Sequence, residues 1–365
     1  LGSSSPLDDA TGVAVDANII LTFSEAVAVK SGTITLYKSS DNLISTVETI
    51  SLPSGLVTGT GTNQITINPA TTLTSSTGYY LNIDATAFDD SSGNSYAGIT
   101  DATTLDFTIA DVNAPTLSSS TPSDDATGIA VDANIILTFS EVVDIESGNI
   151  TLYKSDGSIV ETIDVTGSKV TGTGTTTITI NPATTLDSST GYYLNIDATA
   201  FDDGSGNSYA GITNTTTLDF TSADINAPTL DSSTPSDDAT GVAVDANIIL
   251  TFSEAVDVES GNITLKKSSD GSTVESIDVT SSLVTGTGTN QITINPATTL
   301  DSSTGYYLNI DATAFDDSSG NSYAGISDKT TLNFTIADII DPTLSSSSPS
   351  DGATGVARTA NIVLT

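Results

Sequence analysis

The stretch "NIILTFSE", residues 134–141, decides the fold class. Ile135, Leu137 and Phe139 alternate with residues on the other side of the chain, which is the period-two signature of a half-buried strand. The same alternation recurs in "NITLYK" (149–154), "TTITINP" (176–182), "GYYLNID" (191–197) and "TTLDFT" (216–221). Clusters of Gly, Ser, Asn, Asp and Pro separate these segments, and no amphipathic helical pattern intervenes. The pattern predicts an all-β fold of immunoglobulin-like β-sandwiches, each with seven to eight antiparallel strands.

The chain consists of copies of one unit. The motif "FSE" begins at Phe23, Phe139 and Phe252, at spacings of 116 and 113 residues, and a unit of about 113 residues has the usual size of one domain. We predict three Ig-like repeats in an elongated array, followed by the start of a fourth, which leads us to expect a longer array. The predicted domains are 1–112, 113–226, 227–340 and the partial 341–365.

Composition excludes several classes of function. The chain has no Cys and no His, so thiolate chemistry, disulfides and the commonest transition-metal ligand are excluded. A formal net charge of −37 repels nucleic acid and anionic membranes, which bind basic patches. No apolar run is long enough to span a bilayer, so we expect no membrane contact by this segment. Any metal site must therefore use oxygen ligands.

Three longer motifs carry a resemblance to a known family. They are "STPSDDATGVAVDANIILTFSEAV" (233–256), "TINPATTLDSSTGYYLNID" (293–311) and "FDDSSGNSYAG" (315–325). Together they resemble the bacterial immunoglobulin-like tandem repeats of large surface adhesins, calcium-dependent adhesin extenders and S-layer-associated proteins. This resemblance covers all three units, and it implies a bacterial extracellular or cell-surface location and a spacer role.

Acidic residues cluster in the predicted turns. Between Pro115 and Ala227 the chain has fifteen acidic residues and two lysines, and most of the acids fall between the predicted strands. Turns attract Asp for backbone reasons, so solvated turns without an ion are one reading. The other is a set of Ca²⁺ sites, since Ca²⁺ prefers oxygen ligands. Clustering in turns favours the second reading, and we expect Ca²⁺ as the cofactor.

Predicted topology brings acids from three chain segments to each junction between units. If Pro115–Pro122 is the first strand, it is about 26 Å long, and the turn after it lies at the opposite end of the unit from the linker. The turns containing Glu141 and Asp203 return to the linker end. They then face the linker and the acidic turn of the preceding unit. The candidate metal ligands are Asp8, Asp9, Asp89, Asp90, Asp111, Asn113, Asp124, Asp125, Glu141, Asp144, Asp202, Asp203, Asn207, Asp224, Asn226, Asp237, Asp238, Glu254, Asp316 and Asp317.

Two observations bear on where the ion lies. The linker pattern Asp-x-Asn-Ala-Pro, at residues 111–115 and 224–228, resembles the linker of cadherins, in which calcium fixes the angle between successive sandwiches. The resemblance is partial because a second Asp-Asn pair is missing, and at the third junction Ile340 and Asp341 alter the pattern. A rival reading keeps the ion inside one loop, held by Asp202, Asp203 and Asn207 alone.

Strand phase and recurring side chains give further expectations. Tyr192 sits just after a turn and is expected to be a corner tyrosine. Tyr153 and Tyr193 are expected to face outward on neighbouring strands, as a cross-strand pair or as a lateral contact patch. The lysines at Lys38, Lys154 and Lys267 end one strand of each unit, where a charge that blocks strand pairing is favoured over an isopeptide cross-link.

Three readings of function remain. The first is an extender or stalk of a long adhesin or surface fibre, whose partners are the neighbouring repeats of the same chain. In the second, identical chains assemble laterally into a filament, sheath or S-layer-like structure. The third is a glycan-binding array. Enzymatic activity is not expected, because the adjacent acids of one loop do not straddle a bond and recur in every unit.

Overall fold

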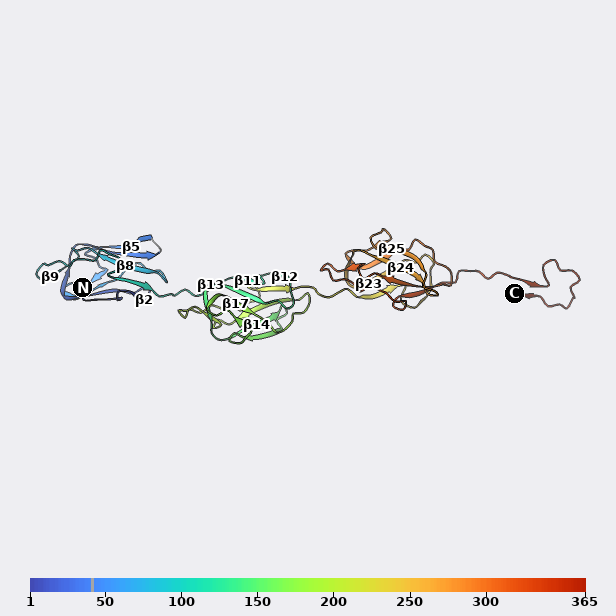
Figure 1. Cartoon of the computed structure of the whole chain (residues 1–365), viewed down its shortest axis with the longest axis horizontal. Coiled ribbons are helices and arrows are strands. Elements are labelled where there is room, and N and C mark those ends of the chain that lie inside the picture. Colours follow the sequence, from blue (N-terminus) through green and yellow to red (C-terminus); the bar gives the residue numbers. More distant parts are fainter. Residues whose placement is uncertain (41–42) are drawn as a thin grey trace. The chain divides into compact units, whose positions relative to one another are not determined.

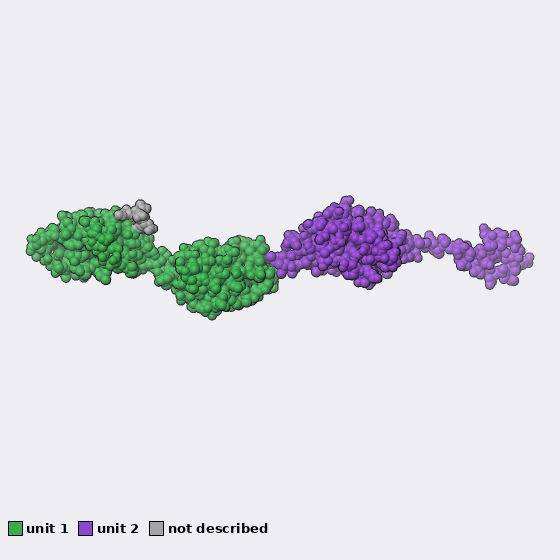
Figure 2. Space-filling view, viewed as in Figure 1, with its two compact units in different colours: residues 1–222 green, residues 223–365 purple. Residues whose placement is uncertain are grey.

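The computed structural model describes residues 1–40 and 43–365. The chain divides into two compact units, Leu1–Ser222 and Ala223–Thr365 (Figure 2). The first contains repeats 1 and 2, and the second contains repeat 3 and a C-terminal segment. Every regular element in the described residues is a strand (Figure 1). The described residues accordingly include no helix able to cross a bilayer.

Each repeat contains ten strands. Those of repeat 1 are β1 (Ser3–Ser5), β2 (Ala10–Val13), β3 (Ile19–Val29), β4 (Gly32–Ser40), β5 (Leu43–Leu52), β6 (Val57–Thr58), β7 (Thr62–Ile67), β8 (Gly78–Ile83), β9 (Phe88–Asp90) and β10 (Asp106–Ile109). Those of repeat 2 are β11 (Leu117–Thr121), β12 (Ala126–Ile129), β13 (Ile135–Ile145), β14 (Asn149–Lys154), β15 (Ile159–Asp164), β16 (Val170–Thr171), β17 (Thr175–Ile180), β18 (Gly191–Ile196), β19 (Phe201–Asp202) and β20 (Asp219–Ser222).

Repeat 3 has the same series. Its strands are β21 (Leu230–Thr234), β22 (Ala239–Val242), β23 (Ile248–Val258), β24 (Asn262–Lys267), β25 (Thr273–Asp278), β26 (Val284–Thr285), β27 (Thr289–Ile294), β28 (Gly305–Ile310), β29 (Phe315–Asp316) and β30 (Asn333–Ile336). After it, β31 (Ser347–Ser348) and β32 (Val363–Leu364) form a two-stranded sheet.

The strands of each repeat form two sheets that enclose one core. In repeat 2 the first sheet has the order β11-β13-β17-β16, with β19 also pairing β13, and the second has the order β12-β20-β18-β14-β15. Alternate residues of both sheets point inward, as the sequence pattern predicts. Leu137 from the first sheet and Leu152 and Leu194 from the second are fully buried in one apolar cluster. The predicted Ig-like sandwich is thereby confirmed.

Two details differ from the predicted strand list. Strands of two to four residues, such as β12, β16 and β19, are too short to display a period-two pattern, so ten strands form where seven or eight were expected. In addition, β12 pairs β20 in parallel rather than antiparallel.

The first strand is also shorter than expected. Leu117–Thr121 pairs with β13 in one sheet, and after the turn at Pro122–Asp125 the chain continues as β12 in the other sheet. The acidic turn is therefore a switch point between the sheets. It does not lie at the end of one long strand that crosses the repeat, and this moves Asp124 and its counterparts away from the position predicted for them.

The tyrosines adopt the predicted arrangements, a corner tyrosine and a cross-strand pair. Tyr192 is buried, and its hydroxyl accepts a 2.8 Å hydrogen bond from the backbone N–H of Asp187, which is the corner arrangement. Tyr153 and Tyr193 are cross-strand partners whose rings stack 4.8 Å apart at 5°. Because the Tyr153 ring covers it, Tyr193 is only 8% exposed, although its strand phase points outward.

The expectation for the lysines is wrong in one respect. Lys154 ends β14, which is paired on both sides by β15 and β18, so it does not protect a sheet edge. Its ammonium group lies 2.6 Å from a carboxylate oxygen of Asp187, and Lys267 forms the same pair with Asp301 at 2.8 Å.

Candidate metal centre

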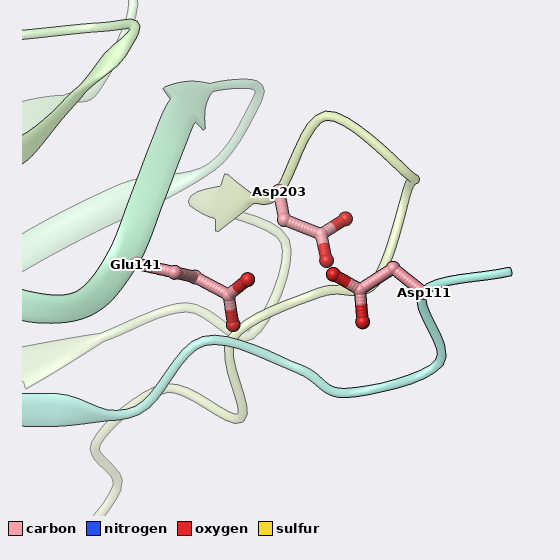
Figure 3. Close-up of side chains that lie close together, drawn as sticks. All are labelled: Asp111, Glu141 and Asp203. Atoms are coloured by element: carbon pink, nitrogen blue, oxygen red, sulfur yellow. The ribbon is translucent and has the colours of Figure 1, made fainter. Parts of the chain in front are cut away.

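Three carboxylates meet where the linker reaches repeat 2. Asp111 comes from the linker between β10 and β11, Glu141 from β13, and Asp203 from the residue after β19. Each contributes an oxygen that lies within 4.8 Å of those of the other two. Figure 3 shows the three side chains converging from separate chain segments. We call this group the linker acid centre.

Repeat 3 has an equivalent centre within the second compact unit. Asp224 of its linker, Glu254 of β23 and Asp317 after β29 have carboxylate oxygens within the same 4.8 Å. The side chain that comes from the loop is the most buried in each case, with Asp203 6% and Asp317 5% exposed. In repeat 1 the counterparts Glu25 and Asp90 line a cavity of about 160 Å³.

Local sequence holds the loop acid in place. The backbone N–H groups of Ser205 and Asn207 each donate to Asp203 Oδ1 at 2.8 Å, and the Asn207 side chain donates to Oδ2 at 2.7 Å. Gly206 adopts φ 85°, a left-handed conformation that glycine reaches without strain and that closes the turn. Asp90 makes the same bonds in repeat 1 and Asp317 in repeat 3. The loop therefore orders itself with its own hydrogen bonds.

The same asparagine ties the loop to the linker. Asn207 Nδ2 also donates to the Asp111 carbonyl oxygen at 3.1 Å, and Asn321 makes the equivalent 3.2 Å bond to Asp224. The Asp111 carboxylate accepts bonds from the backbone N–H of Asn113 at 3.0 Å and from Ser75 Oγ at 2.9 Å. The linker acid of this unit is thus bonded to residues of repeat 1 and lies against residues of repeat 2.

The charges of the centre are not balanced by the protein. Among the described residues, no Lys or Arg forms an ion pair with Asp111, Glu141 or Asp203. Burial, together with the charges of Asp111 and Asp203, raises the pKa of Glu141. Burial and the charges of Asp224 and Asp317 raise the pKa of Glu254 in the same way. In the first centre, Glu141 is therefore the carboxyl that protonates most readily.

Hydrogen bonds act in the opposite direction on the two aspartates of the first centre. The backbone N–H of Asn113, followed by the Ser75 hydroxyl, lowers the pKa of Asp111. Burial acts to raise the pKa of Asp203, but the bonds from Asn207 and Ser205 outweigh it and leave that pKa lowered. Both aspartates are consequently held as anions, and a set of carboxylate oxygens is the ligand type that Ca²⁺ prefers.

The family of the chain follows from comparison with known proteins. The profile of a bacterial Ig-like domain family matches residues 1–109, 111–222 and 224–336. The chain belongs to this bacterial Ig-like domain family. Among curated proteins, none matches the chain.

Several solved structures resemble the Ig-like chain at low sequence identity. The chicken CNTN1 FN1–FN3 domains are 11% identical, with 90% of this chain and 99% of that one covered and a TM-score of 0.28. A biofilm associated protein BSP domain is 12% identical, with 93% and 67% covered and a TM-score of 0.20. The S-layer protein rSbsC(31-844) is 11% identical, with 93% and 55% covered and a TM-score of 0.19.

Several predicted ligands of the Ig-like repeats lie outside the linker acid centre. Asp8 accepts a bond from the backbone N–H of Asp106 at 3.2 Å, at the start of β10. Asp111 follows Asp106 by five residues, or about 16 Å of extended chain. The sheet switch therefore separates the acidic turn of repeat 1 from the linker, and Asp8 and Asp9 are not among the acids that meet at the centre of repeat 2. Asp124, Asp125, Asp237 and Asp238 lie in the same turn of repeats 2 and 3.

The other candidates of the Ig-like repeats are placed as follows. Asp144 and Asp202 are cross-strand neighbours on β13 and β19, as are Asp257 and Asp316 in repeat 3. Burial and the charges of Asp144 and Asp203 raise the pKa of Asp202. Asp202 and Asp203 thus face different neighbours, which does not favour the rival reading of one ion held by that loop alone.

The remaining candidate ligands are Asp89, Asn113 and Asn226, and they make the following contacts. Asp89 lies 4.0 Å from the ammonium group of Lys30. Asn113 and Asn226 donate their backbone N–H groups to the linker aspartates Asp111 and Asp224.

Sequence reasoning missed Ser75 and Asn321 as groups that bind the linker. It named Asn207 as a candidate metal ligand, but not as the donor of a hydrogen bond to a linker carbonyl. The recurrence of "SSTG" and "GNSYAG" in every repeat was the available signal.

Proposed function

We propose that the chain is a structural extender segment of a bacterial extracellular adhesin or surface fibre, in which Ca²⁺ at the linker acid centres holds each linker against the repeat that follows it. Its role is to provide reach and stiffness, without catalysis. Three tandem bacterial Ig-like domains support the structural role.

One observation carries the calcium part of the proposal. The same Asp-Glu-Asp group recurs at the start of repeats 2 and 3, always with one acid from the linker and two from the following repeat. Two carboxylates about 5 Å apart repel by about 3 kcal/mol at an effective dielectric constant of 20. A bound divalent cation converts this repulsion into attraction between linker and repeat.

Solution scattering and calorimetry of the full chain test this proposal. With Ca²⁺ at millimolar concentration, the range of weak extracellular sites, the maximum dimension should become better defined and the melting temperature should rise. Chelation should reverse both changes. The Glu141→Gln, Glu254→Gln double variant should lose the response, and Asp156→Asn in an exposed turn is the matched control. A maximum dimension and melting temperature that ignore Ca²⁺ refute the calcium role.

Electron microscopy tests the extender role itself. Isolated thin rods of the purified chain support it. Ordered filaments of many chains would instead support lateral assembly, and binding of the purified chain to a glycan array would support the third reading.

A further inference from the structure

A second acidic feature lies at the sheet switch of each repeat, away from the linker acid centre. Because β12 runs parallel to β20, the turn before β12 places Asp124 beside the first residue of β20. The Asp219 backbone N–H donates to Asp124 Oδ1 at 3.1 Å, and in repeat 1 the Asp106 backbone N–H donates to Asp8 Oδ1 at 3.2 Å. We call the contact between these paired strands the seam of the repeat.

Repeat 3 carries an amide at the same place and reveals the geometry of the side chains. Asn333 occupies the position of Asp106 and Asp219. Its backbone N–H donates to Asp237 Oδ1 at 3.0 Å, and its side-chain amide donates to the same oxygen at 2.9 Å. A side chain at this position therefore reaches the carboxylate of the acidic turn and can supply it with a hydrogen. In repeats 1 and 2 the side chain is a carboxyl group, which supplies one only when it is protonated.

The titratable groups described around the two carboxyls are acids or phenols. Asp219 faces Asp124 and Asp125 of the turn and is the cross-strand neighbour of Tyr193. Asp106 likewise faces Asp8 and Asp9 and neighbours Tyr80. Among the described residues, neither carboxyl has a Lys or Arg within ion-pair distance. Two such carboxylates side by side cannot both ionise without cost.

The protonation behaviour agrees with this geometry. Burial raises the pKa of Asp219, and the hydrogen bond with Asp124 and the charges of Asp125 and Asp124 raise it further. Burial, the hydrogen bond with Asp8 and the charges of Asp9 and Asp8 raise the pKa of Asp106.

We propose that the pairs Asp8–Asp106 and Asp124–Asp219 each take up and share one proton in mild acid, so that the seams of repeats 1 and 2 tighten as the pH falls while the amide-closed seam of repeat 3 does not respond. A carboxyl whose folded-state pKa is raised stabilises the fold fully below its unfolded value, 3.8 here, and loses that contribution as the pH rises through the folded value. The response is thus a gain of stability on acidification, and it is independent of the calcium proposal.

Hydrogen exchange of the full chain, in chelator and at several pH values between about 7 and 4, tests the proposal. After correction for intrinsic exchange, the opening equilibrium of the β20 amides should fall relative to the β30 amides by up to tenfold per pH unit, the limit for one linked proton. Asp219→Asn should abolish the pH response in repeat 2 and leave that of repeat 1 intact.

The reciprocal variant Asn333→Asp supplies the second readout, since it should install the response in repeat 3. The proposal is overturned by an Asp219→Asn chain that keeps the wild-type pH dependence. It is equally overturned by an Asn333→Asp seam that stays independent of pH, or by seams that respond to added Ca²⁺ but not to pH.

Discussion

Replacing Glu141 by Gln is the sharpest single test of the linker acid centre. The change keeps the size of the side chain and removes one negative charge from a group whose carboxylate oxygens lie within 4.8 Å of one another. At that distance each of the two repulsions amounts to about 3 kcal/mol at an effective dielectric constant of 20. Because the centre is partly open to water and salt, about 1 kcal/mol of net relief is the more realistic size.

The variant should therefore be more stable than the wild type when divalent cations are removed. For a domain of this size, 1 kcal/mol corresponds to a rise of about 4–8 °C in the melting temperature of repeat 2. In millimolar Ca²⁺ the order should reverse, because the wild type gains a bound ion that the variant holds weakly. The stabilisation by a ligand grows with its concentration over its dissociation constant, so the difference should widen as Ca²⁺ is added.

Differential scanning calorimetry of the full chain in chelator and across a Ca²⁺ series measures both effects. Glu254→Gln is the internal replicate in the second compact unit, and Asp187→Asn, which breaks a surface ion pair with Lys154, is a control for loss of one charge. A Glu141→Gln chain that melts lower than the wild type in chelator would refute the repulsion argument. An unchanged Ca²⁺ response would refute the assignment of Glu141 as a ligand.

Three further outcomes are expected. Burial and neighbouring charges raise the pKa of Glu141, so protons should compete with Ca²⁺ at a pH above the ordinary glutamate value. Calorimetric titration should therefore find that the affinity for Ca²⁺ falls as the pH drops from neutral through that raised pKa. A Ca²⁺ affinity that does not change down to pH 4.5, the ordinary value, contradicts the role of Glu141 as the group that takes up the proton. Tyr192→Phe removes the acceptor of the 2.8 Å bond from the Asp187 N–H, and urea unfolding should report a loss of about 1–3 kcal/mol, whereas Tyr153→Phe, which keeps the stacked ring, should cost little. Phe139→Ala deletes a buried ring whose centroid lies 5.4 Å from that of Phe201 and 5.2 Å from that of Tyr209. It should destabilise repeat 2 by about 3–5 kcal/mol, with the variant's other repeats melting as in the wild type.

The core of each repeat was predictable because its signal is strictly local. Ile135, Leu137 and Phe139 alternate along one strand, and each is buried as that phase requires. Tyr192 was predictable for the same reason, since a turn fixes its position. The burial of Tyr193 was not predictable, because it depends on the Tyr153 ring of another strand. A period-two pattern carries no information about which rings will meet across strands.

The linker acid centre was predictable only where the topology was read correctly. Asp111, Glu141 and Asp203 come from segments that any Ig-like sandwich brings to one end, and they meet. Asp124 was misplaced because the expected eight-residue strand is only five residues long, Leu117–Thr121, and the turn after it carries the chain into the other sheet as β12. No apolar periodicity records such a switch, since both strands keep their inward residues.

That switch explains why two acidic features coexist in each repeat without merging. Asp8 and Asp111 belong to opposite ends of β10, so the Asp8 carboxylate meets that of Asp106, whereas Asp111 meets the acids of the loop and of β13. The two features then differ in what can reduce the repulsion between their carboxylates. The linker group gathers three carboxylates, two of them held as anions by hydrogen bonds, which suits a divalent cation. The seam pairs two carboxyls in a position where repeat 3 uses a single amide hydrogen, which suits a proton. Removing cations and lowering the pH should therefore act at different places in the same repeat, and in opposite directions on its stability.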